Sequence, residues 1–173
     1  MKPVSLLPAR LIALLGSMAP LMAAAQIGTA MRFKGVIFTV DRALVEKQLI
    51  PAKAPVSKDG PLFTASDPAE LYKSLIDQSA APRGGSSMVV LPDVETTSGQ
   101  TGMAEKNGVS IRIDPILGKD GERVVGHILV KTADRAQRGT LGAKVGEPSC
   151  PGAYPSVDPN KLEVLFFKAE AVK

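Results

Sequence analysis

The stretch NGVSIRIDPILGKDGERVVGHILVK, residues 107–131, carries the clearest structural pattern of the chain. Asn107 and Gly108 both tolerate positive φ, which is typical of a tight hairpin turn. Apolar and polar residues then alternate, as they do in a strand with one buried face. We expect Pro115 to limit this strand, because proline cannot donate to a sheet ladder. A turn and a second apolar run at 123–132 follow, so the stretch predicts antiparallel strands joined by short turns.

Two further strands are predicted just before this stretch, at 87–94 and 101–105. Thr96 and Thr97 suit the edge of a strand, and Ser98-Gly99 turns the chain at little steric cost. We interpret this Thr- and Ser-rich turn as structural. A small polar recognition loop is the alternative interpretation.

The outer parts of the chain add two strands and two helices. The apolar and aromatic run at 30–40 predicts a strand, interrupted at Gly35 by a bulge or a close backbone approach. Short helices are predicted at 41–49 and at 66–79, where an Asp-Pro start and a capping-box glutamate mark the N-terminus. A last strand is predicted at 161–172. The fold class expected is α+β, mainly antiparallel β-sheet with two short helices.

Two segments lack periodicity and are expected to be flexible loops. Residues 50–61 carry three prolines and a Lys-Asp-Gly turn, and residues 134–160 are rich in Gly, Pro and charge. The second segment holds Cys150, the single cysteine of the chain, in what is expected to be a surface loop. A lone cysteine cannot form an intramolecular disulfide, so Cys150 is either a free thiol or an intermolecular link. An incidental thiol is the favoured interpretation.

Residues 1–25 are expected to be a signal peptide. Lys2 and Arg10 precede or flank an apolar run, no acidic residue is present, and Ala23-Ala24-Ala25 offers a small-residue cleavage site after Ala25. An uncleaved N-terminal anchor is the alternative. The expected mature protein, residues 26–173, is a single domain located in the periplasm.

Charge and composition exclude a nucleic-acid-binding role. Cleavage would remove two basic residues, leaving 19 Lys and Arg against 17 Asp and Glu. The chain has no Trp and no basic run with interleaved aromatic residues, both of which would favour nucleic acid. The expected partner is therefore a protein or a second copy of this chain.

No constellation of residues predicts catalysis. His127 is the only histidine, so a metal site would lack nitrogen ligands. Cys150 and His127 are not expected to form a thiol–base pair, because nothing in the sequence orders the loop that carries Cys150. Asp114, Asp120 and Glu122 surround one turn without the spacing of a calcium loop, and are interpreted as solvated charges. No catalytic residue, cofactor or metal is assigned.

The order of the motifs resembles the core of the secretin family, the outer-membrane channel subunits of secretion systems and type IV pilus machinery. The resemblance rests on three consecutive segments of this chain, VLPDVETTSGQ at 90–100, GVSIRIDPIL at 108–117 and the Asp120-Gly121 turn. They are similar to the family's "VLSAPRVTTLSGQ" strand, its "GVxLxVxPxI" strand and its "DG" turn. The resemblance covers about 100 residues, 28–49 and 62–132, and implies a secretin-core fold.

The chain departs from that family at the pore. In channel-forming members a long insertion separates the first two motifs, whereas here only TGMAEKN lies between them. The strand at 108–114 is also shorter than the roughly nine to eleven residues that cross a bilayer, and its outer face includes Arg112. The resemblance therefore implies a core without channel activity, with outer-membrane association no more than peripheral.

The leading expectation is an exported, non-enzymatic periplasmic protein that acts through protein–protein contact, linked to secretion or pilus machinery. Sheet edges at 108–114 and 161–172 are the expected contact surfaces. Adjacent phenylalanines in the last strand point to opposite faces, so one of them needs cover outside the main core. The candidate interaction residues are Phe166, Phe167, Arg112, Thr96 and Thr97.

The alternative function is a periplasmic module that binds a small ligand or a carbohydrate. On this hypothesis the segment 134–160 forms the contact surface, with Tyr154 and the neighbouring prolines as its apolar part. Binding of sugars or peptides would distinguish this hypothesis from the first.

Overall fold

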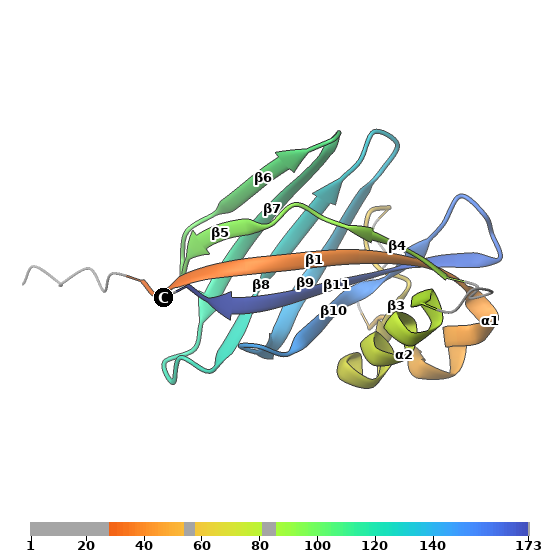
Figure 1. Cartoon of the computed structure of the whole chain (residues 1–173), viewed down its shortest axis with the longest axis horizontal. Helices are drawn as coiled ribbons and strands as arrows, with labels where there is room; N and C mark the ends of the chain where they lie inside the picture. Colours follow the sequence, from red (N-terminus) through yellow and green to blue (C-terminus); the bar gives the residue numbers. More distant parts are fainter. Residues whose placement is uncertain (1–27, 54–57, 81–85, 173) are drawn as a thin grey trace, which may run out of the picture.

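The computed structural model describes residues 28–53, 58–80 and 86–172. Within these ranges the chain forms three layers, which are two short helices, a seven-stranded sheet (the large sheet) and a four-stranded sheet (the small sheet). Figure 1 shows both helices at one end of the molecule, with the strands of the small sheet crossing those of the large sheet obliquely. The predicted signal peptide lies outside the described residues. No helix of the described part is long and apolar enough to cross a membrane.

The large sheet has the strand order β2-β3-β10-β11-β1-β4, and β5 pairs with β1 beyond the end of β4. Its strands are β1 (Ala30–Asp41), β2 (Leu49–Pro51), β3 (Phe63–Ala65), β4 (Ser86–Val90), β5 (Val94–Thr97), β10 (Pro148–Pro155) and β11 (Lys161–Ala171). The small sheet has the order β6-β7-β8-β9, with β6 (Gly102–Lys106), β7 (Val109–Leu117), β8 (Arg123–Lys131) and β9 (Ala136–Lys144). Every pairing is antiparallel, so the predicted fold class is confirmed.

The small sheet contains the hairpins that the sequence predicts, with one correction. Asn107 and Gly108 have φ values of 52° and 75°, as the predicted turn between β6 and β7 requires. Pro115 does not limit the strand, since β7 continues to Leu117. The Pro115 carbonyl accepts from Gly99 N at 2.8 Å, on the side away from β8. The proline nitrogen faces the same way, so the β7–β8 ladder loses no donor.

The strands β1 and β11 lie in the centre of the large sheet, and each of its two faces carries buried residues from them. The face toward the small sheet carries Phe33 and Phe167, and the face toward the helices carries Phe38 and Phe166. Each of these four rings is at most 2% exposed. The molecule therefore has two hydrophobic cores that share one sheet.

Gly35 marks a close approach rather than a bulge. It pairs in regular register with Phe167 of β11. A Cβ atom at this position would meet Phe167 Cε1 at 2.6 Å and Leu91 Cδ1 at 2.9 Å. The glycine therefore makes room for the aromatic ring in the core between the sheets.

The helix predicted at 66–79 is α2 (Pro68–Ala80). Asp67 Oδ1 accepts from the N–H groups of Ala69 and Glu70, both at 3.0 Å, which is the expected N-cap. The helix predicted at 41–49 is shorter. It consists of α1 (Arg42–Val45) and one 3₁₀ turn, and Asp41 makes no side-chain cap bond to stabilise a longer helix.

The prediction of a long loop at 134–160 is wrong. Two strands, β9 and β10, occupy most of it, because neighbouring strands supply hydrogen bonds that local propensity does not reveal. The prolines fit because the register of β10 against β11 shifts between Ser149 and Gly152, which is where proline is tolerated in a sheet. The predicted loop at 50–61 begins within β2, and residues 54–57 lie outside the described ranges.

Candidate functional site

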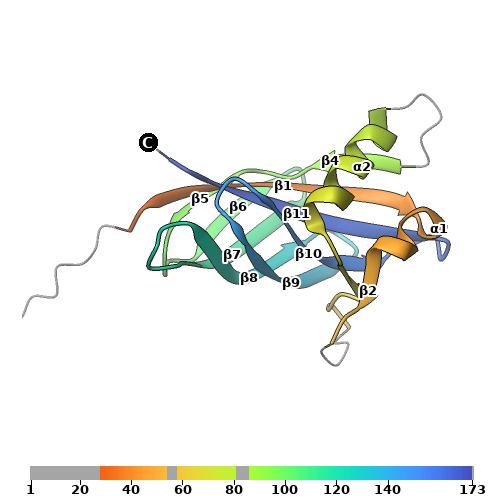
Figure 2. The same ribbon diagram turned by 90° about the horizontal axis from the view of Figure 1, so that it is seen from below.

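Among the described residues, no strand pairs with the outer side of β4, so the large sheet has an open edge there. Leu91 N donates to Gly35 O at 2.9 Å, so the backbone at Leu91 faces β1. Because backbone direction alternates along a strand, the N–H and C=O groups of Met88 and Val90 face away from β1. Strand β4 ends the strand order of the sheet, and Figure 2 shows it at the rim beside α2. This edge offers main-chain donors and acceptors to an added strand.

Three of the five side chains of β4 are apolar and exposed. Met88 is 43% exposed, Val89 52% and Val90 68%, and the strand has no charged residue. Met88 and Val90 project toward the helix side of the sheet, as their partners Phe38 and Val36 do. The sequence pattern gives no sign of this exposure, because an unbroken apolar run usually indicates a buried strand.

In the part of the chain that the structure describes, the other sheet edges carry protection that β4 lacks. Strand β6 ends in Glu105 and Lys106, and β2 has only three residues and includes Pro51. Strand β9 is covered by β10, where Gly142 N donates to Ser149 Oγ at 3.0 Å. Charge, proline, short length and cover are the usual means of preventing edge-to-edge association.

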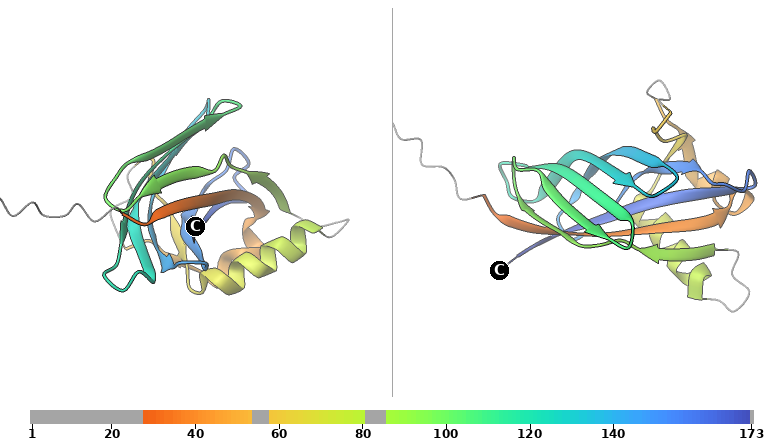
Figure 3. Two further views of the ribbon diagram at one scale, coloured as in Figure 1. Left: turned by 60° about the vertical axis from the view of Figure 1, so that its left-hand side comes forward. Right: turned by 90° about the horizontal axis from the view of Figure 1, so that it is seen from above.

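A hollow of about 410 Å³ adjoins β4 on the helix side of the large sheet. Val36, Tyr72 and Val90 line it, and the Lys34–Glu170 ion pair (2.8 Å) borders it. Tyr72 belongs to α2, which packs on the side of the sheet opposite the small sheet (Figure 3). The Tyr72 ring packs edge-on against Phe166, with centroids 5.2 Å apart. One wall of the hollow is thus anchored in the helix-side core.

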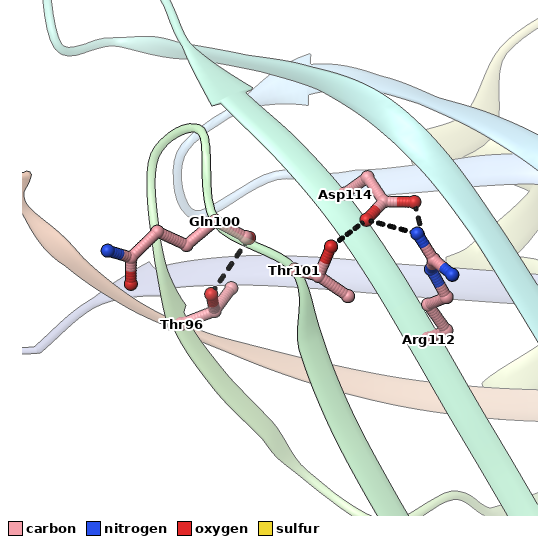
Figure 4. A network of polar contacts seen from close by, with 5 residues as sticks. All are labelled: Thr96, Gln100, Thr101, Arg112 and Asp114. Carbon is pink, nitrogen blue, oxygen red and sulfur yellow. Dashed lines mark hydrogen bonds and ion pairs between the residues drawn. The ribbon is translucent and has the colours of Figure 1, made fainter.

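The Thr- and Ser-rich turn after β5 joins the two sheets (Figure 4). Within the turn, Thr96 Oγ1 donates to Gln100 O at 3.0 Å. Leu117 N of β7 donates to Ser98 Oγ at 2.9 Å, and Gly99 N donates to the Pro115 carbonyl. Thr97 lies at the last position of β5, and its carbonyl accepts from Gln100 N. These bonds hold β7 against the turn, which is the structural interpretation made from the sequence.

A second set of bonds ties the same turn to the outer face of the small sheet. Thr101 Oγ1 donates to Asp114 Oδ1, and Arg112 Nε lies 3.2 Å from Asp114 Oδ2 (Figure 4). The Thr101 hydroxyl and the Arg112 guanidinium both lower the pKa of Asp114. Arg112 is therefore engaged within the molecule, although its side chain is 53% exposed.

The prediction of a contact surface on the last strand is wrong. Phe166 and Phe167 point to opposite faces as predicted, but both are buried, one beneath α2 and the other beneath the small sheet. Neither β7 nor β11 is an edge, since each has a paired strand on both sides. The five candidate residues do not form one surface, because the two phenylalanines lie in cores and the other three at the turn and on β7.

The Cys150 thiol and the His127 imidazole, considered above as a possible thiol–base pair, lie in different layers of the fold. Cys150 lies on β10 rather than in a surface loop and packs against the helix-side core. Burial raises the pKa of its thiol to about 12. His127 is exposed on β8 of the small sheet. Among the described residues no group of three or more His, Cys, Asp or Glu side chains could hold a metal ion.

A second hollow, of about 470 Å³, lies where β9 begins and β10 ends. The turn at 58–60 forms its remaining wall, and Tyr154 and Pro155 contribute to the lining. The hollow adjoins the segment 134–160, which the alternative hypothesis assigned to ligand binding. Most of this segment forms the paired strands β9 and β10.

Searches with the chain against family models, curated proteins and solved structures found no match. The functional assignment therefore depends on the geometry of the chain itself.

Proposed function

We propose that this is an exported, non-enzymatic binding protein that holds an extended segment of a partner protein along the free edge of β4. One observation carries the proposal. Strand β4 combines outward-facing main-chain groups with three exposed apolar residues, and within the described ranges it has none of the charge, proline or cover found at the other edges. Strand addition uses these features, with main-chain bonds for affinity and side-chain pockets for specificity.

The hollow beside β4 supplies the pocket that this mode of binding needs. A strand added outside β4 places alternate side chains on the helix side, next to Val90 and toward the opening lined by Tyr72. Covering one exposed valine fully is worth about 1.5–3 kcal/mol, and each main-chain bond adds about 0.5–1.5 kcal/mol. The favoured ligand is therefore an extended peptide with β-branched or aromatic residues at alternate positions.

The proposal also includes a periplasmic location and a partner in secretion or pilus machinery. The signal-peptide pattern supports a periplasmic location, and the secretin-like order of motifs, which spans β4 to β8, supports a partner in secretion or pilus machinery. On this proposal the protein keeps the sheet of a secretin core and uses a free edge for contact in place of a channel wall.

A labelled peptide tests the proposal. The peptide KVIFTVK copies residues 36–40, the part of β1 that already pairs with the inner side of β4, between two lysines. Fluorescence anisotropy should show saturable binding to the wild-type protein. Val90→Pro removes an outward-facing N–H without breaking the β1–β4 ladder and should weaken binding at least tenfold, about 1.4 kcal/mol.

Val125→Lys provides the matched control. Val125 is 50% exposed, but it lies on β8, whose backbone is paired on both sides. Binding should be unchanged in this variant. Equal binding by wild type and Val90→Pro, or equal loss in both variants, would contradict the proposal. Light scattering of the free protein shows whether a second copy occupies the edge, in which case the dimer should also be lost in Val90→Pro.

A further inference from the structure

The outer face of the small sheet, which points away from the large sheet, carries an excess of positive charge. Because side chains alternate along a strand, the neighbours of the buried Ile113 and Val124 point outward. Five basic and two acidic side chains lie on this face: Arg112, Arg123, Lys131, Arg138 and Lys144, with Glu105 and Asp114. Over all described residues the charges balance, since 17 of the 21 Lys and Arg lie within the described ranges, as do all 17 Asp and Glu. The positive charge is therefore local to this face.

Three of the five basic side chains have no acidic partner in the described part of the chain. Arg112 lies 3.2 Å from Asp114, and Arg138 lies 3.7 Å from Asp59. The other three form no ion pair with a described residue: Arg123, Lys131 and Lys144. All three are exposed, so they are free to bind an anionic partner.

Two of these free basic residues lie directly opposite each other. Arg123 of β8 is the register partner of Lys144 of β9. Like charges in this position destabilise a sheet. Asp120 and Glu122 lie in the turn before β8, but neither forms an ion pair with Arg123 or Lys144. The described chain therefore leaves this pair of cations without a bridging carboxylate.

The large sheet contains a like-charge pair that is neutralised. Lys34 of β1 and Lys168 of β11 are also register partners. Glu170 bridges them, with carboxylate oxygens 2.8 Å from Lys34 Nζ and 3.5 Å from Lys168 Nζ. Lys34 and, to a smaller extent, Lys168 lower the pKa of Glu170. This contrast indicates that the counter-charge for the pair on the small sheet comes from outside the chain.

Exposed apolar side chains lie among the charges of the outer face. Ile116 of β7 and Val125 of β8 are register partners, 59% and 50% exposed. Met103 of β6 is 72% exposed, and the polar pair Asp114–His127 lies between it and the other two. The centre of the face is thus polar, with apolar side chains on either side. A protein interface usually has the reverse pattern, an apolar centre within a polar rim.

A lipid surface accommodates separate basic and apolar side chains, because phosphates bind the first and the acyl boundary takes up the second. We infer that the outer face of the small sheet binds an anionic phospholipid membrane. Arg123, Lys131 and Lys144 contact headgroup phosphates, and Ile116 and Val125 enter the acyl boundary. The inference is independent of the β4 edge, because the two surfaces belong to different sheets and share no residue.

Sedimentation with lipid vesicles tests the inference. The protein is residues 26–173, which contain every described element and leave out the apolar run at 1–25. It should bind saturably to vesicles of equal parts phosphatidylglycerol and phosphatidylcholine at about 0.1 M salt, and far more weakly at about 1 M salt, because salt screens the charges. Vesicles of phosphatidylcholine alone should not bind. Failure to bind the anionic vesicles would overturn the inference, and binding of poly-L-glutamate in their place would assign the face to an acidic protein.

Two double variants locate the charge that binds. Arg123→Gln with Lys144→Gln relieves the like-charge pair, so the fold should be at least as stable, and binding should weaken about tenfold or more. Lys47→Gln with Lys73→Gln is the matched control, because it makes the same change in net charge at exposed residues on the helix side of the large sheet (Figure 3). It should leave binding unchanged. Equal loss in both double variants would contradict binding through the small sheet.

A second pair of variants tests the apolar contribution. Ile116→Ser with Val125→Ser keeps the net charge and should weaken binding about threefold or more, because less apolar surface enters the membrane. Leu44→Ser with Val157→Ser is the control, since these residues are 49% and 84% exposed but lie outside the small sheet. Equal binding by all of these proteins would overturn the insertion of Ile116 and Val125.

Discussion

Replacing Gly35 by alanine tests the close approach between β1 and β11 on which the core between the sheets depends. The new methyl group would lie 2.6 Å from Phe167 Cε1, 2.7 Å from Phe167 Cζ and 2.9 Å from Leu91 Cδ1. Carbon atoms pack favourably at about 3.5–4.0 Å, so the ring must move by roughly 1 Å. Phe167 is 2% exposed and Leu91 3%, which leaves little free space for that movement.

The expected cost follows from this overlap. Inserting one methyl group into a well-packed core costs about 1–3 kcal/mol. A domain of this size loses about 2–4 °C in Tm for each kcal/mol. Urea unfolding followed by circular dichroism measures the change in the free energy of unfolding. Gly142→Ala is the control, because a Cβ on Gly142 meets nothing within 4 Å, and this variant should be neutral or slightly stabilised.

A double variant shows whether the ring is the cause. Phe167→Leu removes the two ring atoms that overlap with the new methyl group. Combined with Gly35→Ala, it should cost less than the sum of the single changes, with a coupling energy of about 0.5–3 kcal/mol. Strict additivity, or a Gly35→Ala protein as stable as Gly142→Ala, would refute the close packing described here.

Three further predictions concern the helix side of the large sheet. Asp67→Ala removes the acceptor for two N–H groups at the start of α2 and should lower the free energy of unfolding by about 1 kcal/mol in urea titrations, whereas an unchanged midpoint would exclude the cap. Phe166→Ala leaves a cavity beneath α2 and should cost about 3–5 kcal/mol by the same measurement; a cost below 1 kcal/mol would contradict a second core. Cys150, with a thiol pKa raised to about 12, should react with iodoacetamide far more slowly in the folded protein at pH 8 than in urea, and equal rates would place it outside the core.

The hairpin region could be predicted from the sequence because local rules determine it. The Asn107-Gly108 turn and the alternation through Ile111 and Ile113 describe a strand with one buried face, which β7 is. The N-cap of α2 is equally local, since Asp67 bonds to N–H groups two and three residues away. Features that depend on neighbours in the sequence can therefore be predicted from it.

Features that depend on pairing between strands far apart in the sequence could not be predicted from it. Strands β9 and β10 form because β8 and β11 lie beside them, and their Gly- and Pro-rich sequence gives no such sign. The exposure of Val89 and Val90 has the same origin, because nothing in an apolar run tells whether a further strand covers it. Phe166 and Phe167 were predicted to face opposite ways, but their burial requires knowledge of α2 and the small sheet.

Residue-resolved amide exchange tests the central claim, that β4 presents a free main-chain edge to a partner strand. In the free protein the amides of Ser87 and Val89, which face β1, should exchange slowly, and those of Met88 and Val90 should exchange rapidly. Saturating KVIFTVK should slow exchange at Met88 and Val90 and leave Ser87 and Val89 unchanged. Rapid exchange at Met88 and Val90 in the presence of bound peptide would contradict strand addition at this edge.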